Sequence, residues 1–400
     1  MTERKIPASI VGTLPGLPGP KRTLAIAGSA HALHDGYTDL IYVLLPVWQA
    51  EFALGFGALA LSRGLYAGAT AALQIPAGRL AERFGSRIVL AWGTALAALG
   101  YALAGFSGGL IGLCIALALS GAGSSTQHPI ASAAVSRAYG AAARGPLGIY
   151  NFSGDLGKVT IPALTSLLLA VMSWRESLWL VALIGIAMAV MIILLMPPAG
   201  GTRAGQAHDD GKVRREHGGF WLLFMIGVLD SGVRTGFLTF LPFLLKAKGA
   251  SLPTIGLALA LVFAGGATGK FACGWLGARF GVLWTVLLTE GGTAACIFAA
   301  LALPLAPTLL LLPLLGIMLN GTSSVLYGTV PELAPPRRAE RAFAIFYTGT
   351  IGSGAVSPVL YGVLGDAVDA VWATVATGAT ALAIVPLAFA LAPRLRPGPD

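Results

Sequence analysis

LWLVALIGIAMAVMIILLM, residues 178–196, is an unbroken apolar run long enough to cross the hydrocarbon core of a bilayer as one helix. It does not alternate between apolar and polar residues, as the strands of a membrane β-barrel do. Comparable runs recur from about residue 23 to residue 392, separated by short polar breaks. We therefore predict a bundle of membrane-spanning helices.

The composition excludes a soluble globular protein. Hydrophobic residues make up 56% of the 400 residues and charged residues 11%, whereas soluble domains carry about 25% charge. The 54 glycines and 24 prolines fit a membrane bundle, in which small residues let helices approach closely. Cys114, Cys273 and Cys296 stand alone in apolar surroundings, so neither a disulfide framework nor a CxxC metal site is expected.

Twelve spans are expected, in two halves of six. They lie at 23–49, 58–78, 87–106, 108–136, 147–172, 176–197, 219–246, 253–273, 282–304, 306–329, 342–365 and 369–392. The divisions are an N-terminal tail at 1–22, an N-terminal half at 23–197, a polar linker at 198–218, a C-terminal half at 219–392 and a tail at 393–400. The tail at 1–22 lacks the short apolar core and cleavage site of a signal peptide.

The two halves repeat each other with a constant offset of 196 positions. The matched elements are Leu45-Pro46 with Leu241-Pro242, Gly78 with Gly274, Arg83-Phe84-Gly85 with Arg279-Phe280-Gly281, and Pro162 with Pro358. One offset across four separate elements indicates two parallel six-span repeats. In transporters built this way the substrate site lies near the membrane midplane, between the halves.

The net charge of +9 sets the orientation in the membrane. Of the 26 Lys and Arg residues, the expected outer segments hold four: Arg63, Arg175, Lys246 and Lys248. Three more, Lys158, Arg234 and Lys270, fall within spans, and the rest lie in the expected cytosolic segments. This bias predicts a bacterial inner-membrane protein with both termini in the cytosol, and it requires no nucleic-acid partner.

The loop between the second and third spans has a recognisable pattern. Gly78-Arg79-Leu80-Ala81-Glu82-Arg83-Phe84-Gly85-Ser86-Arg87 resembles the cytoplasmic signature motif of the major facilitator superfamily. The resemblance implies an all-α membrane protein of twelve helices in two pseudo-symmetric halves. It also implies a gating role for Gly78, Glu82, Arg83, Gly85 and Arg87. The second copy has Ala278 where the acid would stand, so an acid-dependent latch is expected only in the N-terminal half.

Three further stretches resemble one branch of that superfamily, the fosmidomycin-resistance-like exporters. They are Ala30-His31-Ala32-Leu33-His34-Asp35, Gly121-Ala122-Gly123-Ser124-Ser125-Thr126-Gln127-His128-Pro129 and Gly148-Ile149-Tyr150-Asn151-Phe152-Ser153-Gly154-Asp155-Leu156-Gly157. The resemblance implies proton-driven efflux of small, often anionic compounds. Ile130 stands where that branch tends to have an acid, and Asp155 and Lys158 place charges where it has polar or small residues.

The first span has the densest set of polar residues. An ionisable side chain within a bilayer costs about 2.5–3.5 kcal/mol on insertion scales, so each is a functional hypothesis. His31, His34, Asp35 and Asp39 fall on one helical stripe, expected to face the central cavity. We predict proton coupling by Asp35, His34 and His31, with Asp155 of the fifth span. The alternative is a structural His–Asp hydrogen bond, and Asp39 is expected nearer the outer mouth, in contact with water.

Substrate-binding candidates come from other spans. The fourth span offers Gln127 and His128, whose repeat counterpart is Tyr327, and the fifth offers Asn151, Asp155 and Lys158 on one face. The seventh span offers Asp230 and Arg234. Arg234 is the best candidate for holding an anionic group, because a guanidinium donates two fixed hydrogen bonds to a carboxylate or phosphonate.

Two spacings also allow purely structural ion pairs. Asp155 and Lys158 are three residues apart and Asp230 and Arg234 are four apart, so each pair can meet on its own helix. Lys270 and Glu290 are expected near cytosolic span ends, with their charged groups in water and outside the site.

The sequence therefore predicts a secondary transporter of a small, anionic solute, exporting it by alternating access against protons. A proton-coupled importer of an organic anion would use the same fold and charges. A transporter of metals or metal chelates is a third alternative, motivated by His31, His34, Asp35 and His128. No HExxH motif or Ser–Lys dyad supports an enzyme, and neither cofactor nor resident metal is expected. The expected partners are the solute, protons and lipid, and the expected assembly is a monomer.

Overall fold

The computed structural model describes residues 19–197, 217–333 and 339–395, and every regular element within them is helical. Most of the predicted tails and linker, at 1–18, 198–216 and 396–400, lie outside the described residues. The α-helices in chain order are α1 (Gly19–Phe52), α2 (Phe56–Phe84), α3 (Ser86–Gly105), α4 (Leu110–Ser124), α5 (Gln127–Tyr139), α6 (Arg144–Leu168), α7 (Trp174–Leu195), α8 (His217–Ala247), α9 (Leu252–Ala302), α10 (Leu305–Leu333), α11 (Ala339–Ala367) and α12 (Ala370–Leu391).

Three of the predicted spans do not correspond to one helix each. The fourth span consists of α4 and α5, separated by a turn at Ser125 and Thr126. The eighth and ninth spans run together as α9, joined at Gly281, whose φ of +78° is a left-handed conformation that favours glycine. Gly85, its repeat counterpart, has a φ of +87° between α2 and α3. The twelve-span prediction is confirmed.

The helices differ in how apolar they are. Among the described residues, seven stretches are long and apolar enough to cross a membrane: 86–105, 110–142, 174–195, 218–247, 252–302, 305–333 and 370–394. The helices α1, α2, α6 and α11 fall outside this set, although they are 25 to 34 residues long. The first three hold buried ionisable side chains, among them Asp35, Arg63 and Asp155. The less apolar helices therefore supply most of the buried polar side chains that form the site described below.

Close helix packing repeats in both halves. A Cβ atom on Gly121 of α4 would lie 2.2 Å from the carbonyl oxygen of Tyr66, and one on Gly316 of α10 would lie 2.1 Å from that of Val262. Val262 stands 196 positions after Tyr66 and Gly316 stands 195 after Gly121, so a corresponding contact forms in each half. The repeat inferred from the sequence is thus a repeat of backbone packing, in which glycine permits close approach.

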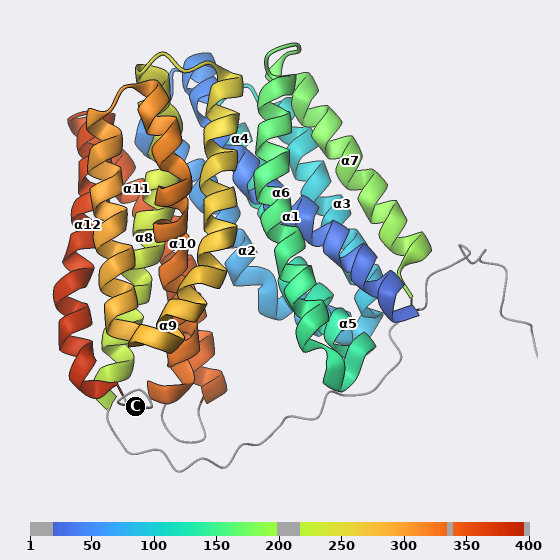
Figure 1. Ribbon diagram of the computed structural model, residues 1–400. Coiled ribbons are helices and arrows are strands. Elements are labelled where there is room, and N and C mark those ends of the chain that lie inside the picture. The colour runs from blue at the N-terminus through green and yellow to red at the C-terminus, as the bar shows by residue number, and fades with distance from the viewer. Residues whose placement is uncertain (1–18, 198–216, 334–338, 396–400) are drawn as a thin grey trace, which may run out of the picture.

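The two halves meet mainly through α2 against α11 and α6 against α9. At one end of the bundle the Asp366 carboxylate of α11 accepts hydrogen bonds from the backbone N–H groups of Phe56 (2.6 Å) and Gly57 (2.9 Å), at the start of α2. Phe56 also packs on Phe240 and Phe243 of α8. In Figure 1 the halves lie together in the upper part of the view and diverge toward the lower end. The molecule is therefore closed at the end where α2 begins.

Candidate functional site

The polar stripe of α1 is buried against α6 and α5. His31 is 3% exposed, and His34 and Asp35 are each 7% exposed. The Nδ1 atom of His31 lies 2.8 Å from the carbonyl oxygen of Tyr150 on α6, and the two rings stack with centroids 4.2 Å apart. The helical spacing that predicted one polar face is confirmed, and α6 holds the first ring of that face in place.

His128 joins this stripe from the start of α5. Its ring lies edge-on to those of His31 and His34, with centroid distances of 5.2 and 4.9 Å. The break between α4 and α5 places His128 here, because α5 begins one residue before it. We call His31, His34, Asp35 and His128 the histidine cluster.

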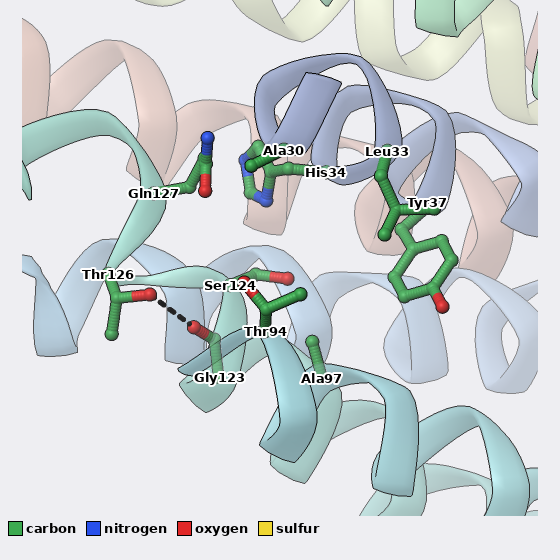
Figure 2. A pocket seen from close by; sticks show the side chains of 10 residues that line it. All are labelled: Ala30, Leu33, His34, Tyr37, Thr94, Ala97, Gly123, Ser124, Thr126 and Gln127. Atoms are coloured by element: carbon green, nitrogen blue, oxygen red, sulfur yellow. Dashed lines mark hydrogen bonds between the residues drawn. The ribbon is translucent and has the colours of Figure 1, made fainter. Parts of the chain in front are cut away.

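A small cavity lies beside the histidine cluster within the N-terminal half, and Figure 2 shows its lining. His34 and Gln127 border it together with Thr94 of α3 and Ser124 of α4. Gln127 is 3% exposed, and its Nε2 atom has no hydrogen-bond partner among the described residues. The cavity thus places His34 near the polar side chains of Thr94, Ser124 and Gln127.

The ion pairs of α6 differ from the expected ones. Lys158 does not pair with Asp155: its Nζ lies 3.3 Å from Oδ2 of Asp35, and Asp155 pairs instead with Lys270 of α9 (Nζ–Oδ1 2.5 Å). Residues three apart point about 60° away from each other around a helix, so Asp155 and Lys158 reach different neighbouring helices. The expectation that Lys270 lies outside the site was wrong, because this lysine, although 38% exposed, links the two halves.

Lys158 also connects the pieces of the N-terminal site. Asp35 uses both carboxylate oxygens: Oδ1 lies 3.5 Å from His31 Nε2 and 3.8 Å from His34 Nε2, while Oδ2 faces Lys158. The Lys158 side chain is 30% exposed. Lys158 therefore links the histidine cluster to the region between the halves, where Asp155 and Lys270 form their pair.

In the C-terminal half, Asp230 and Arg234 do not form the expected ion pair. No carboxylate oxygen of the described side chains lies within 4.0 Å of the Arg234 guanidinium. Arg234 is close enough for its charge to act on Asp230 and Glu290 of its own half and on Asp39 and Lys158 of the other half. It therefore lacks a direct ion pair among the described side chains but has carboxyl groups of both halves around it.

Asp230 contacts Glu290 instead, a residue expected to lie in water at a span end. Glu290 is 2% exposed, accepts a hydrogen bond from Thr322 Oγ1 (2.7 Å), and its carboxyl group lies within hydrogen-bonding range of Asp230. Placing Glu290 outside the membrane core was wrong. The 196-residue offset could have indicated the position of Glu290. It relates Asp230 to His34 and Glu290 to Thr94, and His34 and Thr94 both line the small cavity of Figure 2.

Two buried charges were also assigned to the wrong environment. Asp39 is 6% exposed, not in contact with water at the outer mouth. Arg63, counted with the outer segments, is 5% exposed, its guanidinium lies over the Tyr42 ring (4.4 Å to the centroid), and it donates to the Gly354 carbonyl of α11 (3.4 Å). Both residues belong to the contact between the halves.

The remaining substrate candidates lie apart from the histidine cluster. The Tyr327 hydroxyl of α10 is 3.0 Å from Thr350 Oγ1 of α11. Asn151 is exposed on α6, whereas Asp155 on the same helix is buried. The structure therefore brings together His31, His34, Asp35, His128, Gln127 and Lys158, and leaves Tyr327 and Asn151 on other surfaces.

The signature loop is formed but makes no ion pairs among the described side chains. Gly85 closes the turn, its N–H donating to the Ala81 carbonyl (2.9 Å). Arg83 lies over the Phe84 ring at 5.2 Å, and neither Glu82 nor Arg87 has a partner of opposite charge within 4.0 Å in the described ranges. This loop is at the end of α2 opposite to the Asp366 contact.

Known proteins resemble this chain in sequence and in fold. The chain is 26% identical to a probable sulfoacetate transporter of Cupriavidus necator over 359 residues, covering 81% of this chain and 82% of that protein. It is 24% identical to the fosmidomycin resistance protein of Escherichia coli K12 over 188 residues, covering 46% of each. This second match therefore spans about half the length of that relative.

Solved structures show the same architecture. A bacterial homolog of the human lysosomal transporter Spinster, in an inward-facing and occupied conformation, superposes with a TM-score of 0.79 at 16% identity, covering 96% of this chain and all of that one. The nucleoside transporter NupG gives 0.77 at 11% identity, covering 95% and 100%. The family model of the Major Facilitator Superfamily matches residues 27–224 and 223–400, one match for each half. With that coverage, the twelve-span fold and the internal repeat, the chain belongs to the Major Facilitator Superfamily of transporters.

Proposed function

We propose that this transporter moves a small organic anion and couples the movement to protons by alternating access. The observation that carries the proposal is the arrangement of cations around the contact between the halves. Lys158 and Lys270 come from opposite halves and each pairs with a buried carboxylate, and Arg234 lies nearby without such a pair. An anion entering between the halves would find donors on both sides, and its binding would favour their closure.

The names of the two relatives suggest the class of anion. Sulfoacetate has a sulfonate and a carboxylate group, and fosmidomycin is a phosphonate, so both present tetrahedral oxyanions on a small carbon skeleton. An arginine with two lysines suits such groups, because the guanidinium donates two parallel hydrogen bonds and each ammonium acts as a point charge. We extend this substrate class, small sulfonates, phosphonates and carboxylates, to the present chain.

Proton coupling is proposed for Asp35 with His31 and His34, whereas Asp155, the fourth candidate from the sequence, is proposed to join the halves through Lys270. Asp35 contacts two histidines and Lys158 within 3.8 Å, so a change in its charge alters the attraction on a lysine that reaches the substrate region. Protonating Asp35 would release Lys158 to bind the anion, whereas an ionised Asp35 would hold it. In this scheme the proton and the substrate act on the same lysine, which is one physical basis for coupling.

The charge bias supports an orientation in the inner membrane with both termini in the cytosol. The diverging end of the bundle then faces the cytosol. Export against an inward proton flow is the proposed direction.

The test uses the full chain reconstituted into liposomes with sulfoacetate or fosmidomycin inside and a proton gradient across the membrane. Proton-driven loss of either anion, collapsed by an uncoupler, is the expected result. In cells, overproduction should lower internal fosmidomycin. Accumulation would instead establish import, and transport that ignores the proton gradient would contradict the coupling.

A further inference from the structure

The histidine cluster contains three ligand atoms that converge on one point. One ring nitrogen of His31, one of His128 and one carboxylate oxygen of Asp35 all lie within 4.8 Å of one another. They come from two helices, α1 and α5. Two imidazoles and a carboxylate with an open position form a common ligand set for zinc and related divalent metals.

The hydrogen bond to Tyr150 decides which nitrogen of His31 is available. A carbonyl oxygen can only accept, so the Nδ1 atom 2.8 Å away from it must hold a hydrogen. The Nε2 atom of the neutral ring then presents a lone pair, buried and without a hydrogen-bond partner among the described residues, 3.5 Å from Asp35 Oδ1. A proton on Nε2 would join these two atoms as an imidazolium–carboxylate pair, and a bound metal ion could take the place of that proton. A backbone carbonyl behind the ring is also how metal-binding histidines are oriented.

The backbone of α6 lies directly beside these ligand atoms. A Cβ atom on Gly154 would lie 2.9 Å from His31 Nε2 and 2.6 Å from Asp35 Oδ2, so only glycine leaves both atoms uncovered on this side. The Lys158 ammonium lies on Oδ2 of Asp35, which leaves Oδ1 facing the histidines. His34 is the nearest other titratable group, with its Nε2 3.8 Å from the same Oδ1.

We propose that His31, Asp35 and His128 bind one divalent transition-metal ion of the zinc class, and that the bound ion blocks transport. The ion would occupy Oδ1 of Asp35 and would tie α1 to α5. The blocking step rests on the proposed function, whereas the binding step does not.

The binding test uses the purified full chain without a polyhistidine tag, with His208 and His217 replaced by Gln so that only the cluster histidines remain. Zn²⁺ is titrated by calorimetry, and Co²⁺ by its visible absorption. We expect one ion per chain, and His31→Gln and His128→Gln should each weaken binding by about tenfold or more. His34→Gln is the matched control and should keep the affinity, with thermal unfolding confirming that each variant is folded.

The absence of saturable binding, or equal losses in His34→Gln and His31→Gln, would overturn this site. Inhibition is measured separately, as Zn²⁺ block of proton-driven transport by the otherwise unmodified chain, reversed by a chelator. Binding without block would overturn the inhibitory step. If no transport of the tested anions occurs, the titrations still decide the metal site, so failure of the proposed function can be distinguished from failure of the site.

Discussion

The two halves place different chemistry at corresponding positions. His34 and Thr94 border a small cavity in the N-terminal half, and the residues 196 positions later, Asp230 and Glu290, are two carboxyl groups in contact. The N-terminal half instead surrounds one carboxylate with histidines and Lys158. The backbone repeat is thus retained while the polar groups have diverged, so we assign coupling to one half.

The largest expected effect comes from Asp35→Asn. The amide keeps the size of the side chain but cannot exchange a proton, and Lys158 loses its partner. Proton-driven transport in liposomes should fall to background while the protein remains folded. Glu51→Gln is the matched control, since it removes a carboxylate whose pair with Arg175 is more than one-third exposed. Wild-type transport by Asp35→Asn would move coupling out of the histidine cluster.

Arg234→Gln tests the binding role of the C-terminal half. If Arg234 holds the anion, the substrate dissociation constant should rise by roughly 10- to 150-fold, since a hydrogen bond to a charged group contributes about 1.5–3 kcal/mol. Substrate binding by calorimetry measures this.

The double variant with Asp230→Asn supplies the control. If Arg234 only balances the charge of Asp230, that double variant should recover what each single variant loses. Full recovery would contradict anion binding by Arg234.

The next effect concerns the Asp366 contact that joins the halves. Asp366→Asn weakens two hydrogen bonds to the start of α2, so about 1 kcal/mol of closure at this end should be lost. The ratio of conformations should shift about fivefold toward the state in which this end is open. Distances between spin labels on α2 and α11 report it, in a background without Cys114, Cys273 and Cys296. Asp369→Asn is the control, because Asp369 caps its own helix, α12. Equal shifts in both variants would remove Asp366 from the gate.

The fold follows from the sequence because hydrophobic length, the 196-residue offset and the signature loop report on backbone organisation. The stripe on α1 also follows, since helical spacing fixes which side chains share a face. Partners on other helices do not follow. Spacing showed that Asp155 and Lys158 could pair with each other. It did not show that Lys158 would pair with Asp35 and that Asp155 would pair with Lys270. Glu290 was misplaced because the hydropathy of the residues around it indicates a membrane span but not how deep in the membrane one residue lies. The repeat offset nevertheless relates Glu290 to Thr94.

The smallest effect is expected for the Asp155–Lys270 pair, which joins the two halves directly. Lys270 is 38% exposed, and pairs so accessible to water contribute about 1 kcal/mol or less. The Asp155 side chain is only 10% exposed, so Lys270→Gln leaves a buried carboxylate unpaired, whereas Asp155→Asn leaves a lysine that can turn toward water. Lys270→Gln should therefore slow transport more than Asp155→Asn. The double variant should lie close to Asp155→Asn.

The same pair also connects the halves to the histidine cluster. In Lys270→Gln, Lys158 of α6 is the cation left near two carboxylates, Asp35 and Asp155, and it can pair with either. Whenever Lys158 pairs with Asp155, Asp35 loses its partner. Lys270→Gln should therefore change how the transport rate depends on proton concentration, which a pH series in liposomes measures. Asp155→Asn should not change it, since Lys158 then keeps Asp35 alone. Matching proton dependence in the two variants would mean that the inter-half pair acts independently of the cluster.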